Sequence, residues 1–402
     1  MYSTIKQMDH IADEGIQDKR FFETDIYFSE KDGKAALTHI LNKMDQNLEM
    51  FTTKYPTPSS VNFNYQPLDN IDWTAGFWTG MLWLAYELTS DEKYRRIAET
   101  QLDSFKERID KRIHVDTHDL GFLYTLSAIS AYKLTESNEA KQMALQAADL
   151  LVDRYHEKAG ILQAWGDLTN PNQRGRMIID CNMNLPLLYW ASEVTGRDKY
   201  YQIANSHAWQ AARYIVRNDS STYHTFYMNP ETGEPIKGDT HQGFSDESCW
   251  SRGQAWAIYG FTLSYLYTND LRYIDTAKKT ANYFLNRLPS DFVCYWDLIF
   301  TEGNEERDSS GAAIAACGLL ELSKHLPLLD ENKKIYENAA LRIILSLSEN
   351  YTTKNNNQSN GILLQGVYHK RENVGVNECC IWGDYFYFEA LVRLIKDWKP
   401  YW

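Results

Sequence analysis

Residues 119–134, DLGFLYTLSAISAYKL, and residues 138–156, NEAKQMALQAADLLVDRYH, decide the fold of this chain. The first stretch is apolar on almost every side of a helix, so we expect it to be buried all round. The second stretch is amphipathic, because its apolar residues recur at the spacing of one helix face. These residues are Ala140, Met143, Ala144, Ala147, Ala148, Leu151 and Tyr155. The two stretches therefore predict an inner helix followed by an outer helix.

The same alternation continues along the chain. Further inner helices are predicted at 77–88, 180–194, 252–267, 309–326 and 384–395, and further outer helices near 35–53, 92–109, 197–217, 271–288 and 332–349. Six inner helices ringed by six outer helices make an (α/α)6 barrel, which is the all-α fold that we expect. A solenoid of stacked helix pairs is the alternative, but solenoid repeats hold a tighter period than these helices do. We expect one catalytic domain over 35–402, with residues 1–34 as an N-terminal extension packed on the barrel.

Long connections separate several of these helices, and each leads into an inner helix. They span 54–72, 160–178, 217–251, 297–308 and 351–381. If successive helices alternate in direction, these loops meet at one end of the barrel, where a rigid scaffold commonly carries its functional residues. Within 223–240, an aromatic run followed by the turn-like residues Asn229 to Gly233 predicts a β-hairpin.

Composition narrows the class of ligand. The formal net charge is −13, which argues against nucleic acid as a partner. Aromatic residues make up 14% of the chain, including 12 tryptophans and 27 tyrosines, which suits a groove that stacks sugar rings. No zinc-binding, calcium-binding or nucleotide-binding motif is present, so the sequence implies no metal and no cofactor.

The six cysteines, none of them in a C-x-x-C pair, are predicted to be buried free thiols in a reducing compartment. The first 20 residues are polar and lack the apolar core of a signal peptide. No stretch reaches the roughly 18 apolar residues that cross a bilayer. We therefore expect a cytoplasmic protein with no membrane partner, acting as a monomer or a weak homo-oligomer.

Asp119 and Asp180 each open a strongly apolar inner helix. Burial beside apolar surface raises the pKa of a carboxyl group, and an acid that keeps its proton near neutral pH can serve as a general acid. Capping of the helix N-terminus is the competing interpretation, and it lowers the pKa instead. Both interpretations stay open for these two residues. For Asp308 and Asp384, which also precede or open inner helices, capping is the favoured prediction.

Three more residues are candidates for ligand contacts. Arg252 lies between Trp250 and Trp256, where a guanidinium can grip a carboxylate or stack on a ring, although a structural ion pair is the alternative. His224 and Gln242 lie in the loop 217–251, where a lone histidine is more often a surface residue.

Taken together, these segments resemble the unsaturated glucuronyl hydrolases of glycoside hydrolase family 88, from about residue 40 to residue 402. The similarity is carried by Trp73 to Gly80, His118 to Phe122, Gln163 to Asp167, Ile178 to Cys181, Thr240 to Gly243, Trp250 to Trp256, Arg307 to Ser310 and Ile381 to Tyr385. The resemblance also implies an (α/α)6 barrel.

The family removes the unsaturated uronic acid that polysaccharide lyases leave at the non-reducing end of their products. The resemblance implies that Asp180 is the general acid and base, which protonates C4 of the C4=C5 double bond and then activates the water that adds to C5. It implies that Asp119 is the second essential aspartate, which holds sugar hydroxyls and tunes Asp180. The matching substrate contacts are Trp73, Trp165, His224, Gln242, Arg252 and Trp256. The expected ligands are unsaturated uronic-acid oligosaccharides derived from glycosaminoglycans.

Two positions depart from the pattern of family members. Members that favour sulfated fragments carry Ser-x-x-Ser-x-Lys where this chain has residues 369–374, HKRENV, and His241 stands where some members carry arginine. The preference for sulfated substrates is therefore open. The alternative functions are an unsaturated rhamnogalacturonyl hydrolase acting on pectin fragments and a non-catalytic oligosaccharide-binding barrel. A barrel epimerase is a weaker alternative, since the expected histidine pair on inner helices is absent.

Overall fold

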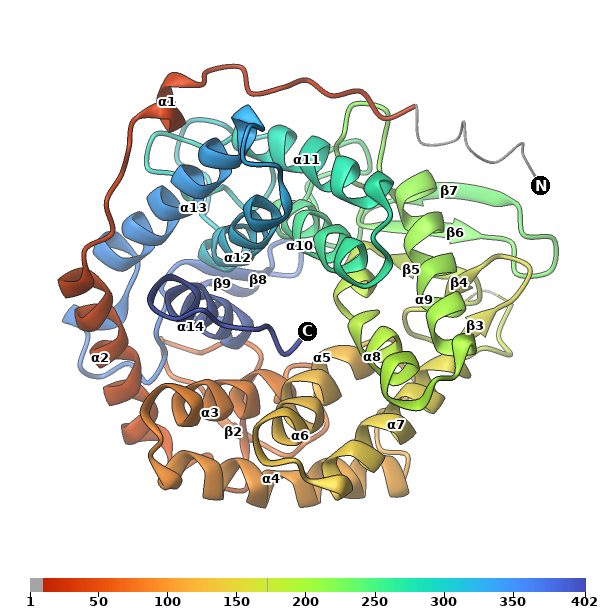
Figure 1. Ribbon diagram of the computed structural model, residues 1–402, viewed down its shortest axis with the longest axis horizontal. Helices are drawn as coiled ribbons and strands as arrows, with labels where there is room; N and C mark the ends of the chain where they lie inside the picture. The colour runs from red at the N-terminus through yellow and green to blue at the C-terminus, as the bar shows by residue number, and fades with distance from the viewer. Residues whose placement is uncertain (1–9, 172) are drawn as a thin grey trace.

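The computed structural model describes residues 10–171 and 173–402, and its helices form two concentric rings (Figure 1). The inner ring contains α3 (Ala75–Thr89), then α5 (Leu120–Tyr124), η1 (Thr125–Ile129) and α6 (Ser130–Thr135) in line, then α8 (Pro186–Thr195), α10 (Ser251–Thr268), α12 (Ser309–His325) and α14 (Ile381–Ile395). The outer ring contains α2 (Glu30–Asn47), α4 (Glu92–Asp110), α7 (Asn138–Val152), α9 (Asp198–Gln210) with η3 (Ala211–Ile215), α11 (Leu271–Leu285) and α13 (Glu331–Asn350). The last inner helix, α14, packs against the first, α3, so the ring closes. The predicted (α/α)6 barrel is confirmed, and the solenoid alternative is wrong.

Burial explains the two rings. Every residue of α12 from Ser309 to Ser323 is buried, whereas α4 buries a single face that includes Tyr94, Ala98 and Phe105. The outer helices α4, α7, α11 and α13 each begin with an aspartate or serine whose side chain accepts a backbone amide of the first turn. The apolar pattern thus sets the layer, and the caps set where the outer helices begin.

The inner ring is less regular than the sequence predicts. The segment predicted as a helix from 180 begins instead as the 3-10 helix η2 (Ile179–Met183), and α8 starts only at Pro186. Proline has no amide hydrogen and is accommodated in the first turn of a helix, which explains the late start. The run 119–134 contains the π-helical turn η1, a form that is frequent near functional sites.

The two aspartates predicted as caps behave differently. Asp308 does cap α12, because its Oδ1 accepts the amide of Ser310 at 3.1 Å. The prediction for Asp384 is wrong, because α14 begins three residues earlier and has Cys380 as its N-cap. The Asp384 carboxylate instead accepts the amides of Ile362 and Leu363 from the preceding loop.

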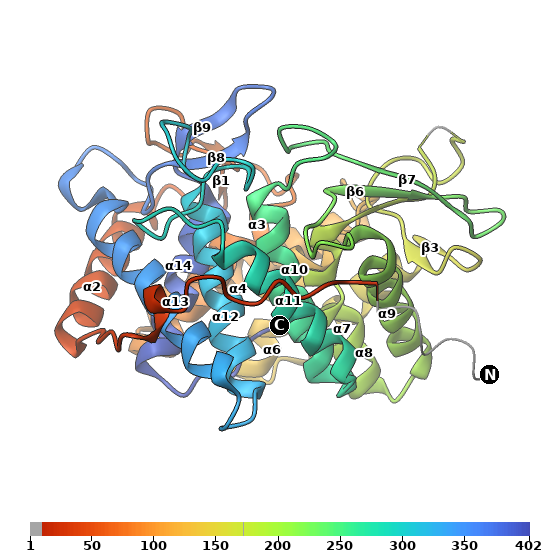
Figure 2. The same cartoon turned by 90° about the horizontal axis from the view of Figure 1, so that it is seen from above.

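Small antiparallel sheets gather at one end of the barrel (Figure 2). The largest contains β5 (Arg176–Ile178), β6 (Thr225–Met228) and β7 (Pro235–Asp239), and the predicted hairpin within 223–240 is its β6–β7 pair. The others are β8 (Gly366–His369) with β9 (Val374–Glu378), β1 (Tyr55–Pro56) with β2 (Pro67–Leu68), and β3 (Tyr155–His156) with β4 (Ile161–Leu162). The long loops therefore meet at this end, which we call the loop end.

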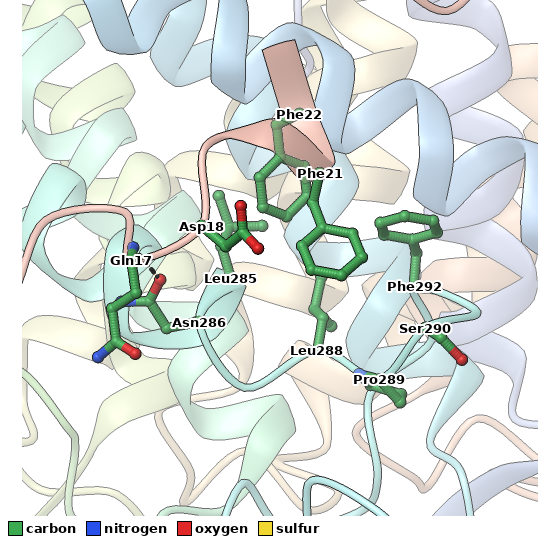
Figure 3. Close-up of a pocket in the computed structure, with 10 residues that line it drawn as sticks. All are labelled: Gln17, Asp18, Phe21, Phe22, Leu285, Asn286, Leu288, Pro289, Ser290 and Phe292. Atoms are coloured by element: carbon green, nitrogen blue, oxygen red, sulfur yellow. Dashed lines mark hydrogen bonds between the residues drawn. The ribbon is translucent and has the colours of Figure 1, made fainter. Parts of the chain in front are cut away.

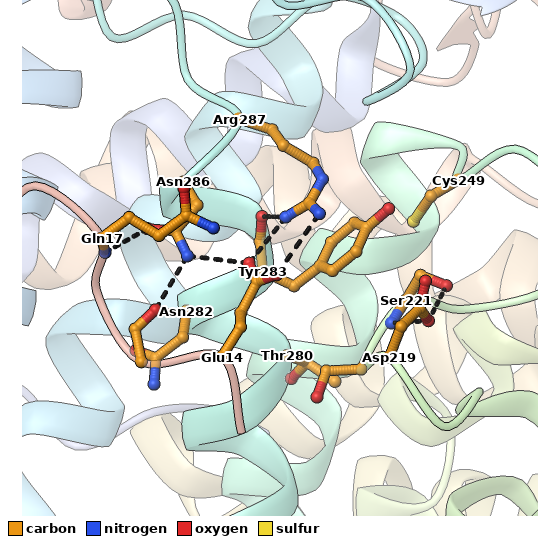
Figure 4. A network of polar contacts seen from close by, with 12 residues as sticks. Glu14, Gln17, Asp219, Ser221, Cys249, Thr280, Asn282, Tyr283, Asn286 and Arg287 are labelled. Atoms are coloured by element: carbon orange, nitrogen blue, oxygen red, sulfur yellow. Dashed lines mark hydrogen bonds and ion pairs between the residues drawn. The ribbon is translucent and has the colours of Figure 1, made fainter. Parts of the chain in front are cut away.

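The described part of the N-terminal segment, which contains α1 (Arg20–Glu23), runs along the outside of α11 and α13 (Figure 1). Polar contacts fasten it: Glu14 pairs with Arg287 at 2.7 Å, and Asn286 donates to the carbonyl of Gly15 (Figure 4). Beyond these, Phe21 and Phe22 turn toward Phe292 around a largely apolar pocket (Figure 3). Residues 1–9 of the predicted extension lie outside the described residues.

The C-terminal residues fold into the middle of the ring (Figure 1). The Trp402 ring stacks on Phe386 and meets Phe122 edge-on, and its indole donates to Glu389 Oε2 at 2.8 Å. Glu389 and Glu321 both contact the buried Arg393, which also donates to the hydroxyl of Tyr259. We call Glu321, Glu389 and Arg393 the plug cluster. Among the described residues, no helix has the length and apolar character needed to cross a membrane.

Candidate active site

A cavity of about 320 Å³ opens at the loop end of the barrel. Its walls come from five parts of the chain that are far apart in the sequence: residue 73 and the stretches 118–119, 165–180, 241–242 and 368–374. The lining residues are Trp73, His118, Asp119, Trp165, Asp180, His241, Gln242, Tyr368, His369, Glu372 and Val374. Five of the eight residues predicted for the site, namely Trp73, Asp119, Trp165, Asp180 and Gln242, therefore lie on one cavity.

Close backbone packing brings the two aspartates together. A Cβ atom on Gly121 would lie only 2.3 Å from the Cα of Asn184, so this position requires glycine. The side chain of Asn184 accepts the amide of Phe122 at 2.7 Å. These contacts clamp the start of α5 onto the end of η2. As a result, side-chain atoms of His118, Asp119 and Asp180 all lie within 4.8 Å of one another.

The His118 imidazole lies between the two carboxyl groups. Its Nε2 is 3.3 Å from Asp119 Oδ1 and 3.5 Å from Asp180 Oδ1. Asp119 also accepts a hydrogen bond from the hydroxyl of Thr117 at 2.6 Å, whereas Asp180 Oδ1 is buried without a hydrogen-bond partner. Neither carboxylate accepts a helix-capping bond. The capping interpretation of these two residues therefore does not hold.

The two carboxyl groups differ in acidity. Burial raises the pKa of Asp180 to about 6, against the opposing field of His118 and with a further rise from Asp119. Burial acts in the same direction on Asp119, but the charge and hydrogen bond of His118, the Thr117 hydroxyl and Arg108 outweigh it and lower the pKa of Asp119. Two neighbouring carboxyl groups with separated pKa values are the arrangement in which one serves as an acid while the other stays ionised.

Aromatic rings form the walls beside this pair. Trp73 packs against Phe77, Phe122 and Trp382, and its indole donates to the Tyr368 hydroxyl at 3.1 Å. Across the cavity lining, Trp165 faces His241 on one side, and the guanidinium of Arg176 lies 4.8 Å from its ring. Such flat faces suit a sugar ring, whose C–H surfaces pack on aromatic rings.

His224, Arg252 and Trp256 lie behind the lining residues, with at most 3% of each exposed. Arg252 donates to Asp308 Oδ2 at 2.9 Å, to Gln242 Oε1 at 2.7 Å and to the carbonyl of Tyr368 at 2.8 Å. Its guanidinium therefore holds Gln242 and strand β8 from behind the lining. Its ion pair with Asp308 matches the structural ion pair that was the alternative to a ligand contact. The predicted sugar contacts of the three residues stay predictions.

The predicted site leaves out six lining residues: His118, His241, Tyr368, His369, Glu372 and Val374. His118 was visible as the neighbour of Asp119, but only the fold turns it toward Asp180. His241 lies in the loop before α10, and the other four lie in the β8–β9 hairpin, where no periodic pattern distinguishes them from an ordinary surface turn.

Two groups of lining residues have ligand atoms close enough to be considered for a metal ion: His118 with both aspartates, and His241 with His369 and Glu372. In the second group the amide of Glu372 donates to His369 Nδ1 at 3.3 Å. A neutral ring that accepts at Nδ1 carries its proton on Nε2, the nitrogen that faces Glu372 Oε1 at 3.7 Å. This arrangement favours a hydrogen-bond donor over a metal ligand.

Comparisons with known proteins agree with this geometry. A sequence profile described as Glycosyl Hydrolase Family 88 matches residues 43–386. An unsaturated chondroitin disaccharide hydrolase from Streptococcus pneumoniae (strain ATCC BAA-255 / R6) is 47% identical over 385 residues, covering 96% of this chain and 97% of the relative. An unsaturated glucuronyl hydrolase from Bacillus sp. (strain GL1) is 45% identical over 368 residues, covering 91% and 98%.

Solved structures extend the similarity to three dimensions. The unsaturated glucuronyl hydrolase from Streptococcus agalactiae superposes with a TM-score of 0.94 at 46% identity, covering 98% of this chain and 99% of that one. An aspartate-to-asparagine variant of that enzyme, in complex with dGlcA-GalNAc6S, gives a TM-score of 0.87 at 44% identity, with the same coverage. The profile spans most of the chain, and the relatives share nearly half of its residues over almost their full length. This chain is therefore a glycosidase that belongs to glycoside hydrolase family 88.

Proposed function

We propose that this protein is an unsaturated glucuronyl hydrolase that releases the unsaturated uronic acid from the non-reducing end of glycosaminoglycan fragments produced by lyases. The observation that carries the proposal is the pair at the cavity: Asp180, with one buried oxygen unpartnered and its pKa raised to about 6, faces Asp119, whose pKa is lowered. A glycan-binding protein without catalysis has no need of two carboxyl groups with separated pKa values.

In the first step, the protonated carboxyl group of Asp180 donates its proton to C4 of the C4=C5 double bond. The π electrons form the new C4–H bond, and the positive charge is shared between C5 and the ring oxygen. Asp180 becomes a carboxylate. Its neighbour Asp119 is already ionised, and the negative charge of both groups stabilises the cation that develops next to them.

In the second step, a water molecule adds to C5 and gives its proton to the Asp180 carboxylate. Asp180 is thereby returned to its protonated form. The resulting hemiketal opens by breaking the bond between C5 and the ring oxygen, and the hemiacetal left at C1 then releases the neighbouring sugar. Because the chemistry is hydration of an enol ether, the rules that relate carboxylate spacing to stereochemistry in ordinary glycosidases do not apply.

We assign Trp73, Trp165, Gln242 and Asp119 to substrate binding. Trp73 and Trp165 would pack against the sugar rings, and Gln242, held by Arg252, would present its amide nitrogen to an oxygen of the uronic acid. Asp119 would accept hydroxyl groups of the same ring. His224 and Trp256 would support these contacts from behind the lining.

The substrate class follows from the relatives. Those at 45–47% identity are named unsaturated chondroitin disaccharide hydrolases or unsaturated glucuronyl hydrolases, and one solved relative holds dGlcA-GalNAc6S. We further propose that the protein acts in the cytoplasm as a monomer or weak homo-oligomer, with residues 35–402 as one catalytic domain and residues 1–34 as an extension. All six cysteines are buried free thiols, which suits a reducing compartment.

Incubation with unsaturated disaccharides made by lyases from chondroitin, hyaluronan, heparin and rhamnogalacturonan tests the proposal. The expected result is loss of the ultraviolet absorbance of the conjugated alkene with glycosaminoglycan disaccharides. Loss only with the rhamnogalacturonan fragment would select the pectin alternative, and no loss with any of them would reject the proposal. In D₂O, nuclear magnetic resonance spectra at early times should show one deuterium at C4 of the product, because the proton that Asp180 donates comes from the solvent. Direct hydrolysis at C1 would leave C4 unlabelled.

A further inference from the structure

The imidazole of His118 is enclosed and points one nitrogen at both carboxyl groups of the site. Only 1% of the residue is exposed, and its backbone amide donates to the carbonyl of Ala164 at 2.7 Å. Nε2 lies 3.3 Å from Asp119 Oδ1 and 3.5 Å from Asp180 Oδ1. The ring therefore sits where a single N–H can hold two carboxyl groups in a fixed relation.

The groups around His118 favour a positive charge on it. Asp119 at the start of α5 and Asp180 in η2 face Nε2 directly, and the thiol of Cys181 is the third titratable neighbour. Burial raises the pKa of Cys181, which keeps this thiol uncharged. Farther away, His207 on α9 is neutral because burial lowers its pKa to about 3. Beyond the carboxyl groups lie two guanidinium groups, Arg108 of α4 beside Asp119 and Arg252 of α10 on the Asp180 side.

The orientation of Asp180 depends on the same contact. Its Oδ1 is the buried oxygen on the His118 side and has no hydrogen-bond partner, yet 19% of the side chain is exposed to the cavity. Since Oδ1 is buried, Oδ2 is the carboxyl oxygen that can reach a sugar. The contact with the imidazole opposes rotation of the carboxyl group that would turn Oδ1 toward the cavity or toward Asp119.

We propose that His118 is a positioning residue of the active site. As an imidazolium, it holds the carboxyl groups of Asp119 and Asp180 in a fixed relation and allows Asp180 to give its proton to the substrate. This inference rests on the proposed function. Two negative charges at contact distance would bind the Asp180 proton too tightly, because each carboxylate raises the pKa of the other. A cation between them opposes that effect, and a general acid works best with its pKa near the working pH.

Two substitutions separate the hydrogen bond from the charge. His118→Gln places a neutral amide nitrogen near the site of Nε2, whereas His118→Ala removes both donor and charge. We expect the basic limb of kcat/KM for His118→Gln to move up by about one pH unit, because the field that lowers the pKa of Asp180 is lost. We expect His118→Ala to lose about 10²-fold in kcat as well, because the carboxyl groups are no longer held.

His207→Gln is the matched control. His207 is fully buried and accepts the amide of Leu162 at Nδ1, but it does not line the cavity. This variant should lose thermal stability and leave the pH profile unchanged. If His118→Gln shows a basic limb at the wild-type position, or if His207→Gln shifts the limb equally, the inference is overturned.

A measurement without substrate distinguishes this inference from the proposed function. In protein labelled with ¹⁵N-histidine, the resonances missing from His118→Gln identify His118. In the wild type they should report a protonated ring at pH 8, and in Asp119→Asn the ring should lose its proton at lower pH. A neutral His118 ring at pH 7 would overturn the inference even if the enzyme cleaves its substrate. A protonated ring in a protein that cleaves none of the disaccharides would instead refute only the proposed function.

Discussion

Two clusters of buried charge lie along the barrel, and they differ in how completely their atoms are paired. In the plug cluster, Glu389 accepts from the Tyr259 hydroxyl, the Arg393 guanidinium and the Trp402 indole. At the loop end, His118 faces two carboxyl groups, yet its Nδ1 and the Oδ1 of Asp180 have no hydrogen-bond partner. A fully paired cluster fixes a structure, whereas a partly paired cluster keeps a proton and an oxygen available for chemistry.

The comparison extends to a third carboxyl group. Burial raises the pKa of Asp384 to about 7, higher than that of Asp180, although the amides of Leu363 and Ile362 and the hydroxyl of Tyr65 oppose the rise. However, only 1% of Asp384 is exposed, and its oxygens accept hydrogen bonds from all three of these donors. A raised pKa alone therefore does not identify a general acid. The distinguishing features of Asp180 are its unpartnered oxygen and its place on the cavity.

The largest effect is expected from Asp180→Asn. The amide has the shape of the acid but no proton to donate, so kcat should fall by about 10³-fold. The circular dichroism spectrum and thermal midpoint should stay near those of the wild type, because Asp180 Oδ1 makes no hydrogen bond that the fold depends on. Near wild-type turnover in this variant would refute the assigned mechanism.

Arg393→Met should damage the fold instead of the chemistry. The substitution leaves Glu321 and Glu389 buried without their cation, which costs about 3–5 kcal/mol of unfolding free energy. Chemical denaturation measures this loss, and kcat of the folded fraction should remain within about threefold of the wild type. As a matched control, the triple variant Arg393→Met, Glu321→Gln, Glu389→Gln should recover part of the stability. A stable Arg393→Met with low kcat would contradict the separation of the two clusters.

The sequence predicted the barrel because burial leaves a local pattern. The inner helices are apolar on nearly every side and the outer helices on one, so the layer of each segment can be read within about four turns. The interruption of 119–134 by a π turn was not predictable, because it depends on packing against neighbouring helices. The late start of α8 was signalled by Pro186, although the prediction did not use that signal.

The site was predicted less completely, because its contacts join distant segments. Asp119 and Asp180 were found since each opens an inner helix, but their opposite pKa shifts depend on where His118 points after folding. The tryptophans on either side of Arg252 predict a ligand contact, with a structural ion pair as the alternative. The donors of Arg252 are taken by Asp308, 56 residues away, and by the carbonyl of Tyr368, 116 residues away. No pattern within a single sequence reveals such pairs.

The pH dependence offers a test of smaller magnitude. The proposed mechanism needs Asp180 protonated, and burial raises its pKa to about 6, so kcat/KM should fall about tenfold per pH unit as the pH rises above 6. Below pH 6 it should level off, and it should fall again only when Asp119, whose pKa lies below 3.8, takes up a proton. A profile of kcat/KM from pH 4 to 9 at constant ionic strength measures the basic limb and the plateau, because the acidic limb lies below this range. Activity that rises from pH 6 to 9 would mean that Asp180 acts as a base in the free enzyme.

The smallest effect on activity is expected from Asp384→Asn, which isolates the raised pKa from the reactive site. Asparagine is neutral, as Asp384 itself is below its pKa of about 7, but its amide nitrogen cannot accept one of the three donors. One buried donor is left unpaired, at a cost of about 1–3 kcal/mol in unfolding free energy. Since Asp384 does not line the cavity, kcat/KM should stay within about twofold of the wild type, and the basic limb of its pH profile should stay at the same pH. A shift of the limb in this variant, measured beside His207→Gln, would place the observed titration on Asp384 and would remove it from Asp180.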